Sequence, residues 1–168
     1  MGLRVYGFII ILIGAVLPGV AQTFDFSGSK KLPEGVIGVS SDMRYSAEAG
    51  YGYGFVPATN FFSVAVPDGN YKVTVTLGSK RKAGVTTLRA ESRRLFLESI
   101  TTKRGEFKTY TFTVNKRSPV ISTTESVRIK PREQHKLNWD DRLTIEIAGA
   151  APQLARLTVE PEIGRAHV

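Results

Sequence analysis

The sequence predicts an all-β protein built as a jelly-roll β-sandwich. Three observations carry this prediction: apolar residues recur at every second position, clusters of turn-forming residues separate the apolar runs, and no window holds a convincing 3.6-residue period. The chain of 168 residues fits one ordinary domain, which can bury a core without disulfide or metal staples. It contains no cysteine, which excludes disulfides, thiolate metal sites and a cysteine nucleophile.

The first residues predict a signal peptide. Residues 1–7 carry one charge, Arg4, and precede the apolar run Phe8 to Val20, after which Ala21 supplies a small residue. We expect cleavage after Ala21, so that residues 1–21 are removed and the mature protein is secreted and free of the membrane. The alternative is an uncleaved anchor, because the apolar run approaches the lower limit of a spanning helix.

The remaining residues predict about ten strands. Phe62, Val64 and Val66 alternate with small or polar residues, and after the turn cluster at 67–70 the alternation resumes over 71–77. These two runs predict a β-hairpin with one face towards the core and one towards water. Further strands are expected at 24–26, 36–39, 85–90, 95–97, 110–114, 127–129, 143–147 and 157–159.

The chain is basic, with 23 Lys and Arg residues against 15 Asp and Glu and a net charge of +8. The segment 80–104 is the main source of the excess, with eight basic and two acidic residues. Such a segment indicates either a solvated loop or a surface that binds a polyanion. For an exported chain we expect acidic polysaccharide, membrane or wall polymer rather than nucleic acid, because no nucleic-acid module signature is present.

The sequence contains no recognisable catalytic constellation. The G-x-S-x-G elbow, the phosphate loop, the zinc-protease motif and the EF-hand are all absent from it. His135 lies in a polar stretch expected to be a surface loop. Asp140 and Asp141 are expected to point to opposite faces and to turn the chain before the strand at 143–147. We therefore expect no catalytic residue, no metal site and no cofactor.

Two aromatic features are candidate sugar-binding sites. The stretch YGYGF at 51–55 interleaves Tyr51 and Tyr53 with glycines, so that exposed rings could stack on a sugar while the backbone approaches it closely. The same pattern is typical of strand corners. Trp139, the single tryptophan, favours packing over a ligand platform because it buries so much apolar area. Candidate partners for uronate carboxylates are Arg93, Arg94 and Lys130.

Six stretches of the sequence, taken together, form a more specific pattern than any one of them alone. They are FDFSG at 24–28, YGYGF at 51–55, VPDGNYKVTVTLG at 66–78, AESRRLFLE at 90–98, RIKPRE at 128–133 and LNWDDRLT at 137–144. Together they resemble the opening domain of bacterial rhamnogalacturonan acetylesterases. The resemblance implies a galactose-binding-like β-sandwich that precedes a catalytic domain of the SGNH (GDSL) esterase type, which deacetylates pectic polysaccharide through a serine nucleophile.

The sequence departs from that family because the Gly-Asp-Ser and Asp-x-x-His blocks of the esterase domain are absent. No catalytic residue is carried over, and we expect no ester hydrolysis by this chain alone. We expect residues 22–161 to form the accessory sandwich, with the missing C-terminal esterase domain as its partner. Residues 162–168 resemble a translated sequencing adaptor, and we expect them to be an artefact.

Three functions remain open at this point. The first, which we favour, is the accessory domain of a secreted carbohydrate esterase, packed on the catalytic domain and helping to hold an acidic pectic chain. The second is an autonomous carbohydrate-binding module for acidic polysaccharide. The third is a structural surface domain, which would carry an exposed apolar partner interface.

Overall fold

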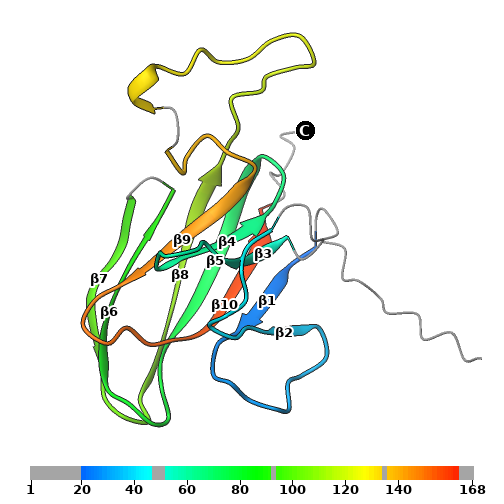
Figure 1. The fold of residues 1–168 in the computed structure, drawn as a ribbon. Helices are drawn as coiled ribbons and strands as arrows, with labels where there is room; N and C mark the ends of the chain where they lie inside the picture. The colour runs from blue at the N-terminus through cyan, green and yellow to red at the C-terminus, as the bar shows by residue number, and fades with distance from the viewer. Residues whose placement is uncertain (1–19, 47–51, 92–93, 134–135, 163–168) are drawn as a thin grey trace, which may run out of the picture.

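The computed structural model describes residues 20–46, 52–91, 94–133 and 136–162, which form a β-sandwich (Figure 1). Sheet A has the strand order β2-β1-β10-β5-β8, and sheet B has the order β3-β4-β9-β6-β7. The strands are β1 (Gln22–Asp25), β2 (Val36–Gly38), β3 (Tyr53–Phe55), β4 (Phe61–Ala65), β5 (Gly69–Gly78), β6 (Gly84–Ala90), β7 (Arg94–Thr102), β8 (Phe107–Lys116), β9 (Arg142–Ala148) and β10 (Leu154–Pro161). The predicted all-β sandwich is confirmed.

Helical structure in the described residues is limited to one 3-10 turn, η1 (Pro131–Glu133). None of the described segments forms a helix of the length and apolar character that crossing a membrane requires. The predicted signal peptide lies outside the described residues except for Val20 and Ala21, and the predicted tail lies outside them except for Glu162.

The period-two alternation places one face of each long strand in the core. On β5, Tyr71, Val73, Val75 and Leu77 are buried, as predicted. The alternate threonines lie on the other face, where Thr74 Oγ1 lies 3.0 Å from Thr111 Oγ1 on β8. This pairing of threonines across neighbouring strands stabilises the exposed face of sheet A.

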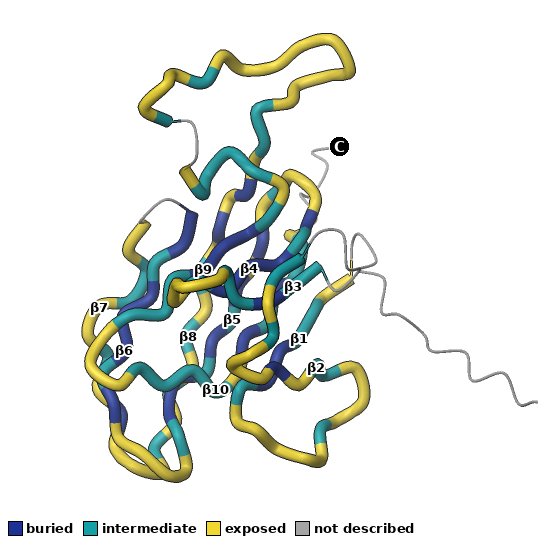
Figure 2. The backbone as a smooth tube through the Cα atoms, in the orientation of Figure 1, coloured by how far each residue is buried: buried dark blue, intermediate teal, exposed yellow. Residues whose placement is uncertain are grey.

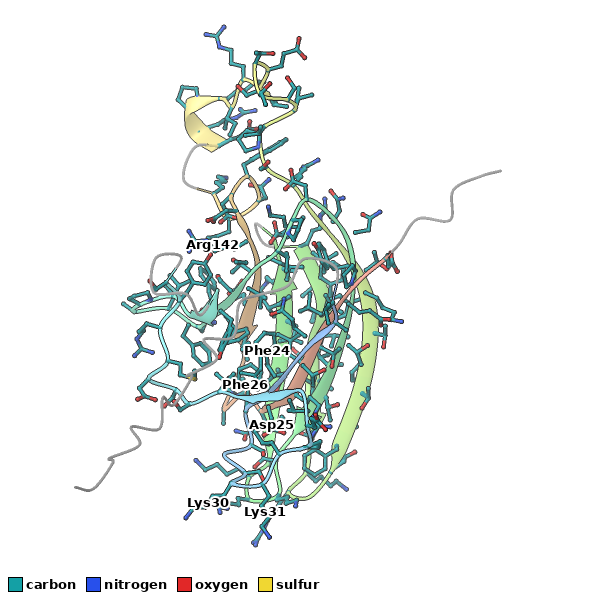
Figure 3. All side chains as sticks on the ribbon, turned by 90° about the vertical axis from the view of Figure 1, so that its right-hand side faces the viewer. Phe24, Asp25, Phe26, Lys30, Lys31 and Arg142 are labelled. Atoms are coloured by element: carbon teal, nitrogen blue, oxygen red, sulfur yellow. The ribbon has the colours of Figure 1, made fainter. Side chains whose placement is uncertain are left out.

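Aromatic rings fill the core between β1, β3 and β4. The Phe62 ring is fully buried and lies 5.2 Å from the Phe24 ring, 5.0 Å from the Phe26 ring and 5.4 Å from the Phe55 ring, between centroids. All three contacts are edge-on, which is the favoured arrangement for ring quadrupoles. Figure 3 shows Phe24 and Phe26 on the first strand and the residue that follows it, with Asp25 between them.

The predicted hairpin of residues 62–77 is wrong, because its two strands belong to different sheets. In sheet B, β4 pairs with β9, whereas β5 pairs with β8 and β10 in sheet A. The chain therefore crosses from one sheet to the other over residues 66–68, between β4 and β5. Asp68 fixes this crossover, because its carboxylate accepts a hydrogen bond of 2.8 Å from Lys116 Nζ at the end of β8 and another from the Ser118 hydroxyl.

The predicted strand at 127–129 is also wrong. Residues 117–133, with 136–141, belong to a long connection between β8 and β9 that protrudes from one end of the sandwich, and its described residues are largely exposed up to residue 133 (Figures 1 and 2). Its only ladder contact among the described residues is an isolated bridge between Val120 and Ser126. The apolar side chains of Val120, Ile121 and Val127 are exposed on this loop, so the alternation there does not report a buried face.

The two ends of the described sandwich lie on neighbouring strands. Gln22 in β1 is opposite Val159 in β10, and Val159 is also opposite Val73 in β5. The last strand therefore occupies the centre of sheet A. The one parallel pair among the described strands is β1 with β2.

Candidate functional site

The outer face of sheet B is the strongest candidate site, because polar side chains are buried on it. Ser63 on β4 and Thr144 on β9 point away from the core, and their exposed fractions are 0% and 2%. Their hydroxyl oxygens lie 2.8 Å apart in a hydrogen bond. The expectation that this face of β4 meets water is therefore wrong at its centre.

Glu91 lies beside this buried pair, directly after β6. Two hydrogen bonds join it to one residue, since the Thr144 N–H donates to Glu91 Oε1 at 2.9 Å and the Glu91 N–H donates to Thr144 O at 3.2 Å. The φ of Glu91 is 42°, in the left-handed region that residues other than glycine seldom adopt. Such strained backbone clusters at functional sites, which makes Glu91 a candidate functional residue.

Burial raises the pKa of Glu91 to about 7. The hydrogen bond from the Thr144 N–H opposes this rise, Asp140 adds to it, and the charges of Lys116 and Arg94 lower the pKa. The carboxyl is therefore divided between its neutral and ionised forms near neutral pH. In its neutral form it can donate a hydrogen bond as well as accept one.

Glu91 and Thr144 line a pocket of about 460 Å³ on the outer face. Arg89 and Glu146 form an ion pair across β6 and β9, with 3.2 Å between Arg89 Nη1 and Glu146 Oε1. Val56, Phe61 and Leu137 supply apolar wall, and Lys136 adds a further cation. A pocket of this size with apolar walls and a few polar groups is typical of small-molecule binding.

The arrangement can bind a polyhydroxylated ligand, since it combines apolar wall with hydrogen-bond donors and acceptors. The hydroxyl groups that line it belong to Thr59 and Thr144, and Thr144 Oγ1 already bonds Ser63. Within the described ranges, His, Asp and Glu side chains do not gather in a group that could hold a metal ion.

Tyr53 is half-buried and packs against the core. Its ring packs on Phe24, with 5.2 Å between centroids, in strand β3. The neighbouring Gly54 has a φ of 145°, and a Cβ there would lie 2.5 Å from the Tyr45 backbone nitrogen. The glycine therefore permits close approach of the chain's own backbone, which agrees with the strand-corner interpretation, and a ligand role for Tyr53 stays a prediction.

Trp139 is half-buried and lies outside the described core, so of the two packing roles favoured for it, in the core or between domains, the second stays a prediction. The Arg117 guanidinium carbon lies 4.4 Å from the centroid of the Trp139 ring, in a cation–π contact. The ring follows Leu137, a pocket residue, by two positions. A stacking role for Trp139 therefore stays a prediction.

The two predicted uronate-binding cations that the structure describes lie on different elements. Arg94 begins β7 and is exposed, and its charge acts on Glu91. Lys130 is exposed on the protruding loop. Tyr51, Arg93 and His135 lie outside the described residues.

Asp140 and Asp141 share one partner, which corrects the expectation that they point apart. Their carboxylates lie 3.4 and 3.3 Å from Arg142 Nε. They precede β9 in a turn, so the alternation of a strand does not apply to them. The expected turn role of Asp140 is confirmed, because its carboxylate accepts the Arg142 N–H at 3.3 Å.

Sequence reasoning missed the pocket residues Arg89, Glu91, Lys136, Thr144 and Glu146. One usable signal was that Glu91 is one of only two acidic residues in a strongly basic segment. The other four residues have no distinctive sequence pattern around them, because the pocket forms where β4, β6 and β9 meet residues 136–137 of the long loop.

No family model and no curated protein sequence matches the chain. Among solved structures, the protein YxiM of Bacillus subtilis is similar, with a TM-score of 0.50 and 21% identity, over 85% of this chain and 40% of that one. The β-glucuronidase 2 of Bacteroides uniformis, solved with a covalently bound cyclophellitol-6-carboxylate aziridine, gives a TM-score of 0.55 and 8% identity, over 86% of this chain and 18% of that one.

A further structure of a Bacteroides uniformis β-glucuronidase gives a TM-score of 0.53 at 8% identity, with the same coverage. At these identities the likeness shows the fold alone. The chain spans less than half the length of each neighbour. The sandwich is therefore similar to one part of larger proteins.

Proposed function

We propose that this chain is the accessory β-sandwich of a secreted bacterial carbohydrate esterase, and that its outer-face pocket binds one residue of the polysaccharide. The observation that carries the proposal is the pocket itself, where Phe61 and Leu137 face the same space as Arg89, Lys136 and the buried Glu91. A sugar presents C–H groups and hydroxyls together, so its binding site needs apolar side chains as well as hydrogen-bonding ones.

Two further observations support the proposal. The six stretches of the sequence resemble the opening domain of rhamnogalacturonan acetylesterases, and the fold is similar to part of a Bacteroides uniformis β-glucuronidase. In this proposal the ester chemistry belongs to an SGNH-type domain that follows the sandwich. The sandwich contributes binding and no catalytic residue, and the ligand is an acidic pectic chain.

The test is calorimetric titration of the purified chain with rhamnogalacturonan oligosaccharides, in parallel with neutral galactan. Lys136→Gln removes a cation that lines the pocket, and Lys130→Gln removes one exposed on the protruding loop. We expect Lys136→Gln to weaken binding about tenfold, as loss of a charged hydrogen bond does, and Lys130→Gln to leave it unchanged. If only Lys130→Gln weakened binding, the binding site would lie on the protruding loop and not in the pocket. If the parent chain did not bind the oligosaccharides, the proposal would be rejected.

One observation favours the structural alternative. Val120 and Ile121 are 61% and 66% exposed on the protruding loop, as apolar side chains at a partner interface are. This alternative predicts no glycan binding and a partner contact that is lost in the Val120→Ser, Ile121→Ser double variant. Pull-down of a separately produced esterase domain would measure that contact.

A further inference from the structure

Exposed basic side chains gather at one end of the sandwich, opposite the protruding loop. The β1–β2, β5–β6 and β7–β8 connections all lie at this end (Figure 1). Figure 3 shows Lys30 and Lys31 projecting there, with Arg142 near the other end. We call this surface the basic end; it comprises Lys30, Lys31, Lys80, Arg81, Lys82, Lys103 and Arg104.

The charge of the basic end is not balanced within the fold. Residues 27–35, 79–83 and 103–106 contain those seven cations and two acids, Glu34 and Glu106. Glu106 is already engaged, because its carboxylate accepts the Lys103 N–H at 2.8 Å and lies 3.4 Å from Lys108 Nζ. None of the seven basic side chains forms an ion pair with a described residue.

Basic side chains on the strands behave differently. Lys72 pairs with Glu160 at 2.7 Å, and Arg156 pairs with Asp25 at 3.3 Å. Lys72 and Arg156 are therefore neutralised within the fold, whereas the seven cations of the basic end have no ion-pair partner among the described residues. Like charges held together oppose folding, so the fold gains nothing from this arrangement.

The backbone holds the loops of the basic end in place before any ligand binds. The Gly105 N–H donates to Ser79 O at 2.8 Å, and Ser79 forms an isolated bridge with Arg104. The Arg81 N–H donates to Ser79 Oγ at 3.1 Å. Lys80, Arg81 and Lys82 are thus kept beside Lys103 and Arg104, which lowers the ordering cost of binding.

The spread of the cations over three connections favours a polymer over a small ligand. The outer-face pocket includes no residue of the basic end. Cations carried by separate loops suit a chain that repeats its anionic groups. Phe107, 44% exposed, is the large apolar side chain that borders this surface, which gives little area for insertion into a membrane.

We propose that the basic end is a second binding surface, separate from the pocket, that takes a linear polyuronate chain through charge. It goes beyond the proposed function, because it does not require the pocket to bind a sugar. Carboxylates repeated along the polymer would pair with the cations of two loops at once. Binding of this kind is multivalent and weakens with salt.

The test uses the purified full chain with polygalacturonate as the probe. We compare Arg81→Gln, Arg104→Gln with a matched double variant, Arg128→Gln, Arg132→Gln, which removes two exposed arginines from the opposite end. We expect the first pair to weaken binding about tenfold and the second less than about twofold. Binding by the parent chain should fall at least about tenfold between about 50 and 200 mM salt.

Three results would overturn the proposal: equal losses in both double variants, no binding at low salt, or binding tenfold tighter to duplex DNA or to phosphatidylglycerol vesicles than to polygalacturonate. The Lys136→Gln variant separates this proposal from the pocket. If Lys136→Gln abolishes polygalacturonate binding while Arg81→Gln, Arg104→Gln retains it, the pocket alone binds the polymer and the basic end does not.

Discussion

Glu91→Gln should make the protein more stable at alkaline pH. The pKa of Glu91 is about 7 in the folded protein against 4.5 for an unperturbed carboxyl. Each unit corresponds to about 1.4 kcal/mol, so ionised Glu91 destabilises the fold by about 3 kcal/mol relative to the neutral form. Glutamine stays neutral and keeps an oxygen that can accept the Thr144 N–H.

The stability of the folded protein depends on pH in a direction set by the raised pKa of this acid. Between pH 4.5 and 7 the folded state retains a proton that the unfolded state has lost, so stability falls as pH rises through this window. The carboxyls of Asp25 and Asp68 have lowered pKa values, so their contributions are lost only at more acidic pH. We expect Glu91→Gln to exceed the parent by about 3 kcal/mol at pH 8 and by less than about 1 kcal/mol at pH 5.

Urea unfolding followed by circular dichroism at both pH values measures this difference. Glu98→Gln serves as a control, because it makes the same change at an exposed position on β7. Equal pH dependence in the parent and in Glu91→Gln would refute the reasoning. It would mean that water reaches the carboxyl and that the outer face is open there.

Three further changes test the packing. Phe62→Ala should cost about 3–5 kcal/mol in urea unfolding, since it removes a fully buried ring, and a cost below about 1 kcal/mol would contradict the aromatic core. Asp68→Ala should cost about 3 kcal/mol, because it leaves the buried Lys116 ammonium without its carboxylate, and Asp68→Asn should restore part of the loss through the same hydrogen bond. Gly54→Ala should lower the melting temperature by several degrees, because its Cβ would meet the Arg44 and Tyr45 backbone, and an unchanged temperature would show that β3 can move away.

Much of the fold could be predicted because the physical cause is local. A strand with one buried face needs apolar residues at every second position, and β5 shows this directly in Tyr71, Val73, Val75 and Leu77. Pairing is not local. The Pro-Asp-Gly-Asn cluster marks a reversal of the chain, but the choice between a hairpin and a crossover depends on β8, β9 and β10, which come later in the sequence.

The candidate site was harder to predict for the same reason. Ser63 and Thr144 have the sequence pattern of a water-facing side, and they are buried because neighbouring segments cover that part of sheet B. The pKa of Glu91 is raised by burial, and this burial cannot be predicted from the residues next to Glu91 in the sequence. The basic end was visible as a charged segment, but the structure divides that segment, leaving Arg89 in the pocket and Arg94 near it.

The central place of β10 in sheet A sets the order in which the domain can be completed during synthesis. β1 and β5 are joined in sheet A only through β10, which pairs with both of them. The first strand to be synthesised therefore cannot join the sheet until the last strand, residues 154–161, has been made. Bringing such distant segments together carries a large loop-closure cost and slows folding. The nascent chain therefore emerges with β1 and one edge of β5 unpaired. If synthesis stopped before residue 154, sheet A could not form because β10 would be missing.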